Sequence, residues 1–316
     1  MRKKEQNFHS KILLFGEYSI IQESMGLTVP YDLFKGKLTF DQPSNSDDQN
    51  TGRSNKALKD FLTYLRELQS KKKLMVDLDL DQLEADVNSG IHFDSSIPQG
   101  FGIGSSGALV AAVYDRYALD KVDLEADVEK QDIAKLKKIF GQMESHFHGT
   151  SSGVDPLICY LNLPLLIKSS NDIQPVKVAN KRNGKGAIFL IDTGKPRKTE
   201  PLVKYYMEKL EEGSFREFVD RQLKPFTNNC IQAFLHGDME SLFGYMTQLS
   251  AFQFKHFKPM IPHLFKKLWK RGLDSGSYYL KLCGAGGGGF ILGFTQDLED
   301  ARKELKDYNL EVVCHI

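Results

Sequence analysis

The chain has 316 residues, of which 41% are hydrophobic and 26% are charged, close to the averages for soluble domains. This composition excludes a disordered chain or a fibrous repeat, and the length predicts two domains of ordinary size. Lys and Arg total 42 against 41 Asp and Glu, so the chain lacks the positive charge typical of nucleic-acid binding. We therefore expect a cytoplasmic enzyme without a nucleic-acid partner.

The amino-terminal residues look faintly like a signal peptide, but their apolar run covers only Ile12–Phe15 and ends before Glu17. No stretch approaches the roughly 18 consecutive apolar residues of a membrane span, so we expect no membrane partner. The cysteines form no CxxC pair, which predicts free thiols rather than a zinc site or a disulfide framework. These cysteines are Cys159, Cys230, Cys283 and Cys314.

The first third of the chain contains three recognisable patterns. Residues 11–21 read as two short strands interrupted at Gly16 and Glu17, which predicts a hairpin-like start. Residues 41–55 have almost no apolar side chains and predict a loop. In residues 54–70 the apolar positions recur at helical spacing, so this segment predicts a helix with one buried face.

The middle of the chain changes from a glycine-rich turn to buried elements. The turn at 98–108 leads into an apolar run without proline until Pro156, which predicts a loop entering a buried helix. Residues 186–192 are a candidate buried strand, followed by a charged helical stretch at 200–222. We place the domain boundary near residue 180, which gives domains 1–180 and 181–316.

The carboxy-terminal part alternates between the two kinds of element. The pattern predicts a helix at 260–272, strands at 277–283 and 289–294, a helix at 297–308 and a strand at 310–315. This alternation is typical of an α+β fold. Its basic run, Lys266–Arg271, is interpreted as solvated helix charges.

The strongest local signal for chemistry is PQGFGIGSSGA, residues 98–108. Glycines let the backbone approach an anion, and the start of the following helix offers unpaired N–H groups and a positive dipole end. Ser105 and Ser106 could add hydroxyls for phosphate or Mg²⁺, or be ordinary helix N-caps. The predicted phosphate-binding residues are Pro98, Gly100, Gly102, Gly104, Ser105, Ser106 and Gly107.

Two other phosphate-binding loops fit less well. A P-loop of the form GxxxxGK[ST] is absent, because no lysine follows the glycines. A GxGxxG match exists at Gly102, Gly104 and Gly107, but it lies a third of the way along the chain and is weak by itself. A dinucleotide-binding fold is therefore only a runner-up.

Three motifs resemble those of the GHMP kinases: KILLFGEY at 11–18, IPQGFGIGSSGA at 97–108 and KLCGAGGGGFIL at 281–292. The resemblance extends over nearly the whole chain. It implies a two-domain α+β fold, with an amino-terminal phosphate-binding α/β domain and a ferredoxin-like carboxy-terminal domain. It also implies ATP and Mg²⁺ as cofactors, with substrates bound in a cleft between the domains.

Within this superfamily the mevalonate kinases resemble the chain most. The segments that carry this narrower resemblance are HGTSSGVDP, residues 148–156, and DTGKPRKTEPLV, residues 192–203. They imply ATP-dependent phosphorylation of the primary hydroxyl of mevalonate, a step in isoprenoid precursor synthesis. A homodimer is expected from the resemblance alone.

The resemblance also implies roles for four residues. Asp155 would lie beside the substrate hydroxyl as catalytic base, next to Lys11, while Ser106 and Glu144 would hold Mg²⁺. These residue types suit phosphoryl transfer, which needs charge neutralisation and in-line positioning more than covalent help. Whether Asp155 takes the proton or only orients the hydroxyl stays open.

The substrate contacts implied by the resemblance lie in three segments of the chain. Arg197 and Thr199 are candidates for binding a carboxylate, with an exposed turn as the alternative interpretation. The implied substrate residues are Glu17, Tyr18, Arg197, Thr199, Gly284, Ala285 and Gly286.

His146 and His148 stay unassigned, because an HxH pair without a third ligand is usually structural.

Tyr18 departs from the mevalonate kinase pattern, which usually has histidine after the Gly-Glu of the first motif. Tyrosine at this position resembles the phosphomevalonate kinases, so a phosphomevalonate kinase stays open. A heptose-phosphate-like sugar kinase also stays open, because GAGGGGF, residues 284–290, resembles a motif of those kinases. An alternative of another class is a non-catalytic relative that binds a metabolite. The combination of Lys11, Ser106, Glu144 and Asp155 favours an enzyme.

Overall fold

The computed structural model describes residues 6–40, 48–122, 128–178 and 184–316. The chain forms two compact units, each assembled from separate segments. Unit 1 takes the residues up to Lys11, Pro30–Pro98 and Ile103–Leu163, and unit 2 takes Ile12–Val29, Gln99–Gly102 and Pro164–Ile316. The predicted domain boundary near residue 180 falls at 179–183, outside the described residues, and stays a prediction.

The first two strands each contribute residues to both units. β1, Phe8–Phe15, lies beside β2, Gly26–Thr39, in a five-stranded sheet of order β1-β2-β4-β5 with β3 also paired to β2. The prediction of a second strand directly after Gly16 is wrong, because Ser19–Gln22 form the 3₁₀ turn η1. Gly16 and Tyr18 have φ of 114° and 63°, conformations that cannot continue an extended strand.

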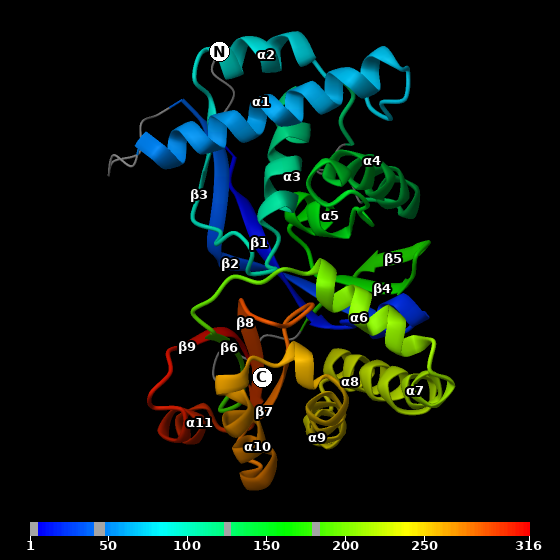
Figure 1. Ribbon diagram of the computed structural model, residues 1–316, viewed down its shortest axis with the longest axis vertical. Helices are drawn as coiled ribbons and strands as arrows, with labels where there is room; N and C mark the ends of the chain where they lie inside the picture. The colour runs from blue at the N-terminus through cyan, green and yellow to red at the C-terminus, as the bar shows by residue number, and fades with distance from the viewer. Residues whose placement is uncertain (1–5, 41–47, 123–127, 179–183) are drawn as a thin grey trace. The chain divides into compact units, whose positions relative to one another are not determined.

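Unit 1 combines five helices with the strand pair β2 and β3. β3, His92–Ser95, runs antiparallel to residues 36–39 of β2. α3 is buried along most of its length because its apolar run packs against α5 and α4 (Figure 1). The helices are α1 (Asp48–Ser70), α2 (Leu80–Asn88), α3 (Ser105–Tyr117), α4 (Lys130–His148) and α5 (Val154–Leu161).

The start of α1 corrects the loop predicted for residues 41–55. The helix begins at Asp48, while residues 41–47 lie outside the described part of the chain. Its polar first turns are helical because tertiary contacts satisfy them: the Ser54 hydroxyl donates to the Phe93 carbonyl, and the Asn55 amide donates to the Val87 and Ile91 carbonyls. The buried face predicted for 54–70 is confirmed by the burial of Leu58, Phe61, Leu62 and Leu65.

Unit 2 contains a four-stranded antiparallel sheet of order β7-β8-β6-β9. Its strands are β6 (Ala187–Asp192), β7 (Tyr279–Leu282), β8 (Phe290–Thr295) and β9 (Leu310–His315). With helices between β6 and β7 and between β8 and β9, the chain order is βαββαβ. This arrangement confirms the ferredoxin-like prediction. The unit also holds β4 (Leu165–Ser169) and β5 (Asp172–Pro175), and residues 165–167 of β4 pair with 26–28 of β2.

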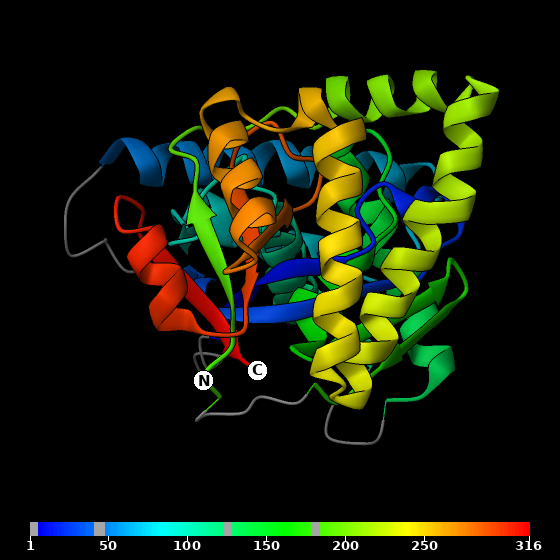
Figure 2. The same ribbon diagram turned by 90° about the horizontal axis from the view of Figure 1, so that it is seen from below.

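The helical stretches predicted for unit 2 are interrupted. Within residues 200–222, α6 and α7 are separated at Glu212, where the chain is extended, and α7 continues directly into the π-helix η2. Pro262, also extended, separates the 3₁₀ turn η3 from η4, and η4 leads directly into α10 within the predicted helix 260–272. Figure 2 shows α8 and α9 side by side, in yellow, as their contacts require. The helical segments are α6 (Glu200–Leu210), α7 (Gly213–Phe218), η2 (Val219–Leu223), α8 (Lys224–His236), α9 (Met239–His256), η3 (Lys258–Met260), η4 (His263–Phe265), α10 (Lys266–Ser275) and α11 (Leu298–Glu304).

Among the described residues, no helix has the combination of length and apolar composition needed to cross a membrane. The cysteines are free thiols, as predicted; Cys159, Cys230 and Cys283 are buried and Cys314 is half-buried.

Candidate functional site

The glycines of the 98–108 motif bring three elements of unit 1 together. Gly104 has φ of 89° and caps α3, and a Cβ on it would lie only 2.9 Å from Lys11 Cγ. A Cβ on Gly107 would lie 2.8 Å from the Asp155 carbonyl carbon. β1 and α5 can therefore approach the start of α3 only because these positions lack side chains.

The first turn of α3 presents backbone N–H groups. Gly104, rather than Ser105 or Ser106, is the N-cap, and it has no side chain that could cap them. The helix hydrogen bonds begin with Ala108 N donating to Gly104 O at 2.9 Å, so the preceding N–H groups are not used within the helix. Such a terminus attracts anions, and the predicted binding of phosphate to these residues is chemically reasonable here.

Lys11 and Asp155 form an ion pair in unit 1. Lys11 Nζ lies 2.8 Å from Asp155 Oδ1, and the two side chains are 8% and 40% exposed. The lysine is held in place because its backbone N–H donates to Ile103 O at 2.9 Å. A buried ammonium therefore stands beside a carboxylate that is open to solvent, and a small alcohol could contact both.

Glu144 is the second carboxylate of the candidate site, and its side chain is buried. The Ser106 hydroxyl donates to Glu144 Oε1 at 2.9 Å, and the Ser151 hydroxyl donates to Oε2. Burial raises the pKa of Glu144 to about 7, and the charge of Asp155 adds to this shift, whereas the two serines and Lys11 oppose it. The carboxyl group therefore exchanges its proton near neutral pH and would ionise fully beside a cation.

The donor set of Ser106 and Glu144 fits a hard cation such as Mg²⁺. Both groups offer oxygen, which Mg²⁺ prefers, and Mg²⁺ usually takes one or two protein ligands together with water and phosphate oxygens. No cluster of three or more His, Cys, Asp or Glu side chains suited to a metal occurs in residues 6–40, 48–122, 128–178 and 184–316. A cation here would therefore depend on phosphate for the rest of its shell.

Two neighbours of this cluster were not predicted from the sequence. His148 Nε2 lies 3.0 Å from the Ser106 hydroxyl, and Ser151 binds Glu144 as described above. Both residues belong to HGTSSGVDP, the motif that also contains Asp155. Their position in this motif is the feature of the sequence that could have indicated a role in the site. An HxH pair by itself did not distinguish a site residue from a structural one.

Tyr18 occupies a strained position in unit 2. Its φ is 63°, and its hydroxyl donates to the Ala285 carbonyl at 2.6 Å. The ring lies 4.8 Å from that of Tyr206 and 5.2 Å from that of Phe257. Burial raises the pKa of the Tyr18 hydroxyl above its ordinary value, so the group stays a neutral hydrogen-bond donor.

Glu17 is enclosed by other side chains of unit 2. Its Oε1 accepts from Lys281 Nζ at 2.8 Å and from Gln253 Nε2 at 2.6 Å, and the Glu17 side chain is 3% exposed. Burial raises the pKa of Glu17, and Lys281 opposes that shift. Lys281 and Gln253 are functional candidates that the sequence reasoning missed, although Lys281 begins the third motif.

Arg197 lies between two glycine positions of unit 2. A Cβ on Gly102 would lie 1.6 Å from Arg197 Nη2, and one on Gly284 would lie 2.6 Å from the same atom. The guanidinium donates to the Cys283 carbonyl, and the Arg197 backbone N–H donates to Gly100 O at 2.9 Å. Arg197 therefore joins residues 100–102 to the glycine-rich loop, whereas Thr199 is exposed at the start of α6.

The glycine-rich loop 284–289 is closely packed. A Cβ on Gly286 would lie 2.5 Å from Met260 O, and one on Gly289 would lie 2.7 Å from Phe101 O. The Gly289 N–H donates to Lys195 O at 2.7 Å. These glycines therefore serve close backbone approach, including approach to Phe101 of the 98–108 motif.

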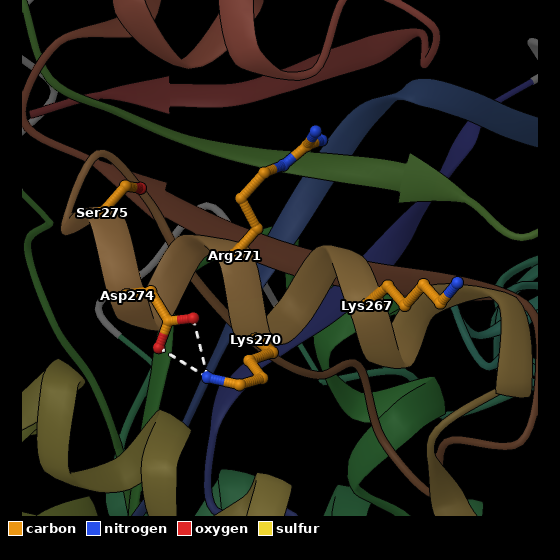
Figure 3. A pocket seen from close by; sticks show the side chains of 5 residues that line it. All are labelled: Lys267, Lys270, Arg271, Asp274 and Ser275. Carbon is orange, nitrogen blue, oxygen red and sulfur yellow. Dashed lines mark hydrogen bonds and ion pairs between the residues drawn. The ribbon is translucent and has the colours of Figure 1, made fainter.

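A separate hollow of about 430 Å³ lies on α10 (Figure 3), lined by Lys267, Lys270, Arg271, Asp274 and Ser275. Lys270 pairs with Asp274 at 2.7 Å, as the dashed lines show, and Arg271 donates to the Glu304 carbonyl at 2.9 Å. These pairings agree with the interpretation of Lys266–Arg271 as solvated helix charges.

Comparison with known proteins gives two family matches. The model described as GHMP kinases N terminal domain matches residues 64–162, and the model described as GHMP kinases C terminal matches residues 230–310. Together these segments cover more than half of the chain.

Individual relatives point in the same direction. A curated mevalonate kinase of Archaeoglobus fulgidus is 28% identical over 210 residues, and the match covers 64% of each protein's length. The structure of L. major mevalonate kinase in complex with R-mevalonate superposes with a TM-score of 0.64 at 16% identity, covering 99% of this chain and 96% of that one. Streptococcus pneumoniae phosphomevalonate kinase, with phosphomevalonate and AMPPNP, superposes with a TM-score of 0.60 at 14% identity, covering 98% of each chain. At these identities the structural matches establish the fold alone.

Proposed function

The chain belongs to the GHMP kinase family, and from this premise we propose that it transfers the γ-phosphate of ATP to the primary hydroxyl of mevalonate. The products would be 5-phosphomevalonate and ADP. The observation that carries the proposal is the arrangement in unit 1 of an accessible carboxylate, Asp155, paired with a buried ammonium, Lys11, at 2.8 Å. The sequence match to a curated mevalonate kinase supports this choice of alcohol.

In the proposed reaction, Asp155 accepts a hydrogen bond from the alcohol and takes its proton as the oxygen attacks the γ-phosphorus. The new bond joins the alkoxide oxygen to phosphorus, and the bond from the γ-phosphorus to the bridging oxygen breaks. Lys11 stabilises the negative charge that develops on the attacking oxygen, because its ammonium is held 2.8 Å from Asp155 and shielded from solvent. Positioning and charge stabilisation are the main requirements of phosphoryl transfer.

The nucleotide side of the proposal uses α3 and its neighbours. The N–H groups of the first turn, with Ser105 and Ser106, bind phosphate oxygens. Ser106 and Glu144 would hold Mg²⁺, which when bound neutralises charge on the β- and γ-phosphates. Glu144 is prepared for this role because the two serine hydroxyls orient its oxygens.

The alcohol side of the proposal rests on unit 2. The Tyr18 hydroxyl donates a hydrogen bond to the Ala285 carbonyl. Because burial raises its pKa, this hydroxyl is a weak acid and does not transfer its proton to the substrate. Arg197 and Thr199 would bind the carboxylate of mevalonate, with Gly284–Gly286 lining the same region. Phosphomevalonate is the second candidate substrate, because tyrosine at position 18 resembles the kinases that use it.

The test uses the purified full chain with ATP and Mg²⁺ and five alcohols: mevalonate, phosphomevalonate, galactose, homoserine and heptose 7-phosphate. We expect ADP formation with mevalonate, and 5-phosphomevalonate identified by mass spectrometry. The Asp155→Asn variant, prepared in the same way, is the negative control, because turnover that persists at the wild-type rate in this preparation would come from contaminating kinases. Turnover with only phosphomevalonate or a sugar would reassign the substrate, and tight metabolite binding without turnover would indicate a non-catalytic relative.

A further inference from the structure

Glu17 and Lys281 form an ion pair that is almost completely withdrawn from solvent in unit 2. Their charged atoms are 2.8 Å apart, and the side chains are 3% and 0% exposed. Removing two charges from water costs several kcal/mol per ion, and well-packed apolar side chains would often stabilise a fold as well or better. Fold stability alone therefore does not explain why charges occupy this place.

The pair is connected to the end of β7, directly before the glycine-rich loop. Gln253 donates to Glu17 Oε1 at 2.6 Å and accepts from the Leu282 N–H at 2.8 Å. Lys281 Nζ also donates to the Leu282 carbonyl at 2.7 Å. Both backbone polar groups of Leu282 thus contact side chains that contact Glu17.

Tyr18 makes a second connection between the same two segments. Its hydroxyl donates to the Ala285 carbonyl, 267 residues away along the chain, at 2.6 Å. Its φ of 63° is uncommon for a bulky residue and is kept only where the surroundings hold it. The Glu17 contacts on one side and the Ala285 contact on the other supply that restraint.

We propose that the Glu17–Lys281 pair is a positioning device that holds Tyr18 and the glycine-rich loop 284–289 in a fixed relation, and that Glu17 does not itself contact the substrate. Glu17 acts through its neighbour because the two residues share a peptide unit, so a movement of Glu17 turns the Tyr18 ring. The change in KM that we expect on mutation of Glu17 rests on the proposed function, whereas the change in hydrogen exchange does not.

The structural test is hydrogen exchange of the Glu17→Gln variant, read in peptides that cover residues 16–24 and 282–290. We expect exchange in both peptides to be roughly tenfold faster than in wild type, since one charge of the pair is lost. The matched control is Asp86→Asn, which removes a carboxylate that is 10% exposed and lies 3.1 Å from Arg116 in unit 1. It should lower stability without changing exchange in these two peptides.

Two results would overturn the proposal at this level. One is unchanged exchange in Glu17→Gln, and the other is an equal change in Asp86→Asn. If Glu17→Gln does not fold, Gln253→Met replaces it, because this variant keeps both charges and removes the hydrogen bonds through which Gln253 connects Glu17 to Leu282. Its exchange should change in the same direction in both peptides.

The kinetic test separates positioning from direct contact. In Glu17→Gln we expect the KM for the alcohol to rise roughly tenfold, with the KM for ATP within about twofold of wild type. In a Tyr18→Phe background the same change should raise the alcohol KM less than about twofold, because the effect passes through the Tyr18 hydroxyl. Effects that multiply would show that Glu17 contacts the substrate directly. A wild-type chain without turnover would reject the proposed function and leave the exchange result to decide the inference.

Discussion

The charged residues discussed above differ mainly in their solvent exposure. Asp155 has an open carboxylate, whereas Glu144, Glu17, Lys11 and Lys281 are buried. A buried charge needs a fixed partner, and each of these four has one at hydrogen-bond distance. Because the Asp155 carboxylate is partly exposed, it can accept a hydrogen bond from an incoming hydroxyl, and for this reason we propose it as the proton acceptor.

Replacement of Asp155 by Asn should lower kcat by roughly 10²–10⁴-fold, because the amide cannot take the proton of the alcohol. The dissociation constant for an ATP analogue should change by less than about twofold, since the N–H groups proposed to bind phosphate belong to α3. Steady-state kinetics and isothermal titration calorimetry measure the two effects. Asp274→Asn, on the exposed face of α10, is the control and should keep wild-type kcat. Near-normal turnover of Asp155→Asn would remove Asp155 from the mechanism.

The lowered pKa of His256 leads us to expect that the stability of the protein depends on pH. Burial beside Phe252 and Phe218 lowers the pKa of His256 below its ordinary 6.5, and Lys255 and Lys209 add to the shift. The unfolded chain therefore binds this proton more readily than the native protein. The contribution of His256 is fully present above pH 6.5 and is lost as the pH falls through the lower native pKa.

The measurement is the free energy of unfolding in urea, from about pH 7.5 down to about pH 5. His256→Phe should show a shallower loss of stability at the acid end than wild type. His236→Gln, at the exposed end of α8, serves as the control and should follow the wild-type curve. If His256→Phe and wild type lose stability in parallel, the half-buried imidazole of His256 is not the cause.

At the scale of elements, backbone contacts decide how the site is built. α3 and α5 approach closely because Gly107 faces the backbone of Asp155 and Pro156. Likewise, the loop 284–289 packs against Met260 and Phe101 through positions without side chains. In both places glycine serves close packing rather than flexibility.

Gly107→Ala should destabilise the protein by about 1–3 kcal/mol, because a Cβ there would lie 2.8 Å from the backbone of Asp155 and Pro156, which cannot rotate away. It should also lower kcat, since α5 carries Asp155. Gly244→Ala is the matched helical control: a Cβ there meets nothing within 4 Å, so the change should stabilise by about 0.5–1 kcal/mol. Urea unfolding and steady-state kinetics check both variants. Equal effects of the two substitutions would contradict the packing argument.

At the scale of the whole molecule, each unit is assembled from distant segments of the chain. Unit 2 needs Ile12–Val29 as well as everything after Pro164, because β4 pairs with residues 26–28 of β2. Tyr18 and Glu17 also contribute buried side chains to this unit. Cutting the chain between Leu163 and Pro164 would therefore leave β4 without its β2 partner and unit 2 without part of its core.

The fragment 164–316 expressed alone should lack a cooperative thermal transition, since β4 loses its β2 partner and exposes an open edge. Mixing it with fragment 1–163 should restore a cooperative transition. Circular dichroism during heating measures both outcomes, with the intact chain as reference. A cooperative transition of 164–316 by itself would show that residues 12–29 are dispensable for unit 2.

The amino-acid sequence by itself determined the family, the α+β class and most of the carboxy-terminal elements. These features depend on contiguous patterns: the glycine motif at 98–108, the buried strand at 186–192 and the alternation after residue 277 are all visible within short windows. It also placed Lys11, Ser106, Glu144 and Asp155 among the site candidates through motif order. It failed where local conformation depended on distant partners, as at the start of α1, whose polar residues are satisfied by Phe93 and Val87.

Only the tertiary structure decided which side chains meet. Tyr18 and Ala285 are 267 residues apart, Gln253 and Glu17 are 236 apart, and His148 and Ser106 are 42 apart. Residue type and local spacing do not encode such pairings, because they arise from the packing of whole elements and from the desolvation of the groups involved. For the same reason the buried Glu17–Lys281 pair became visible only once β7 and the first motif were seen together in unit 2.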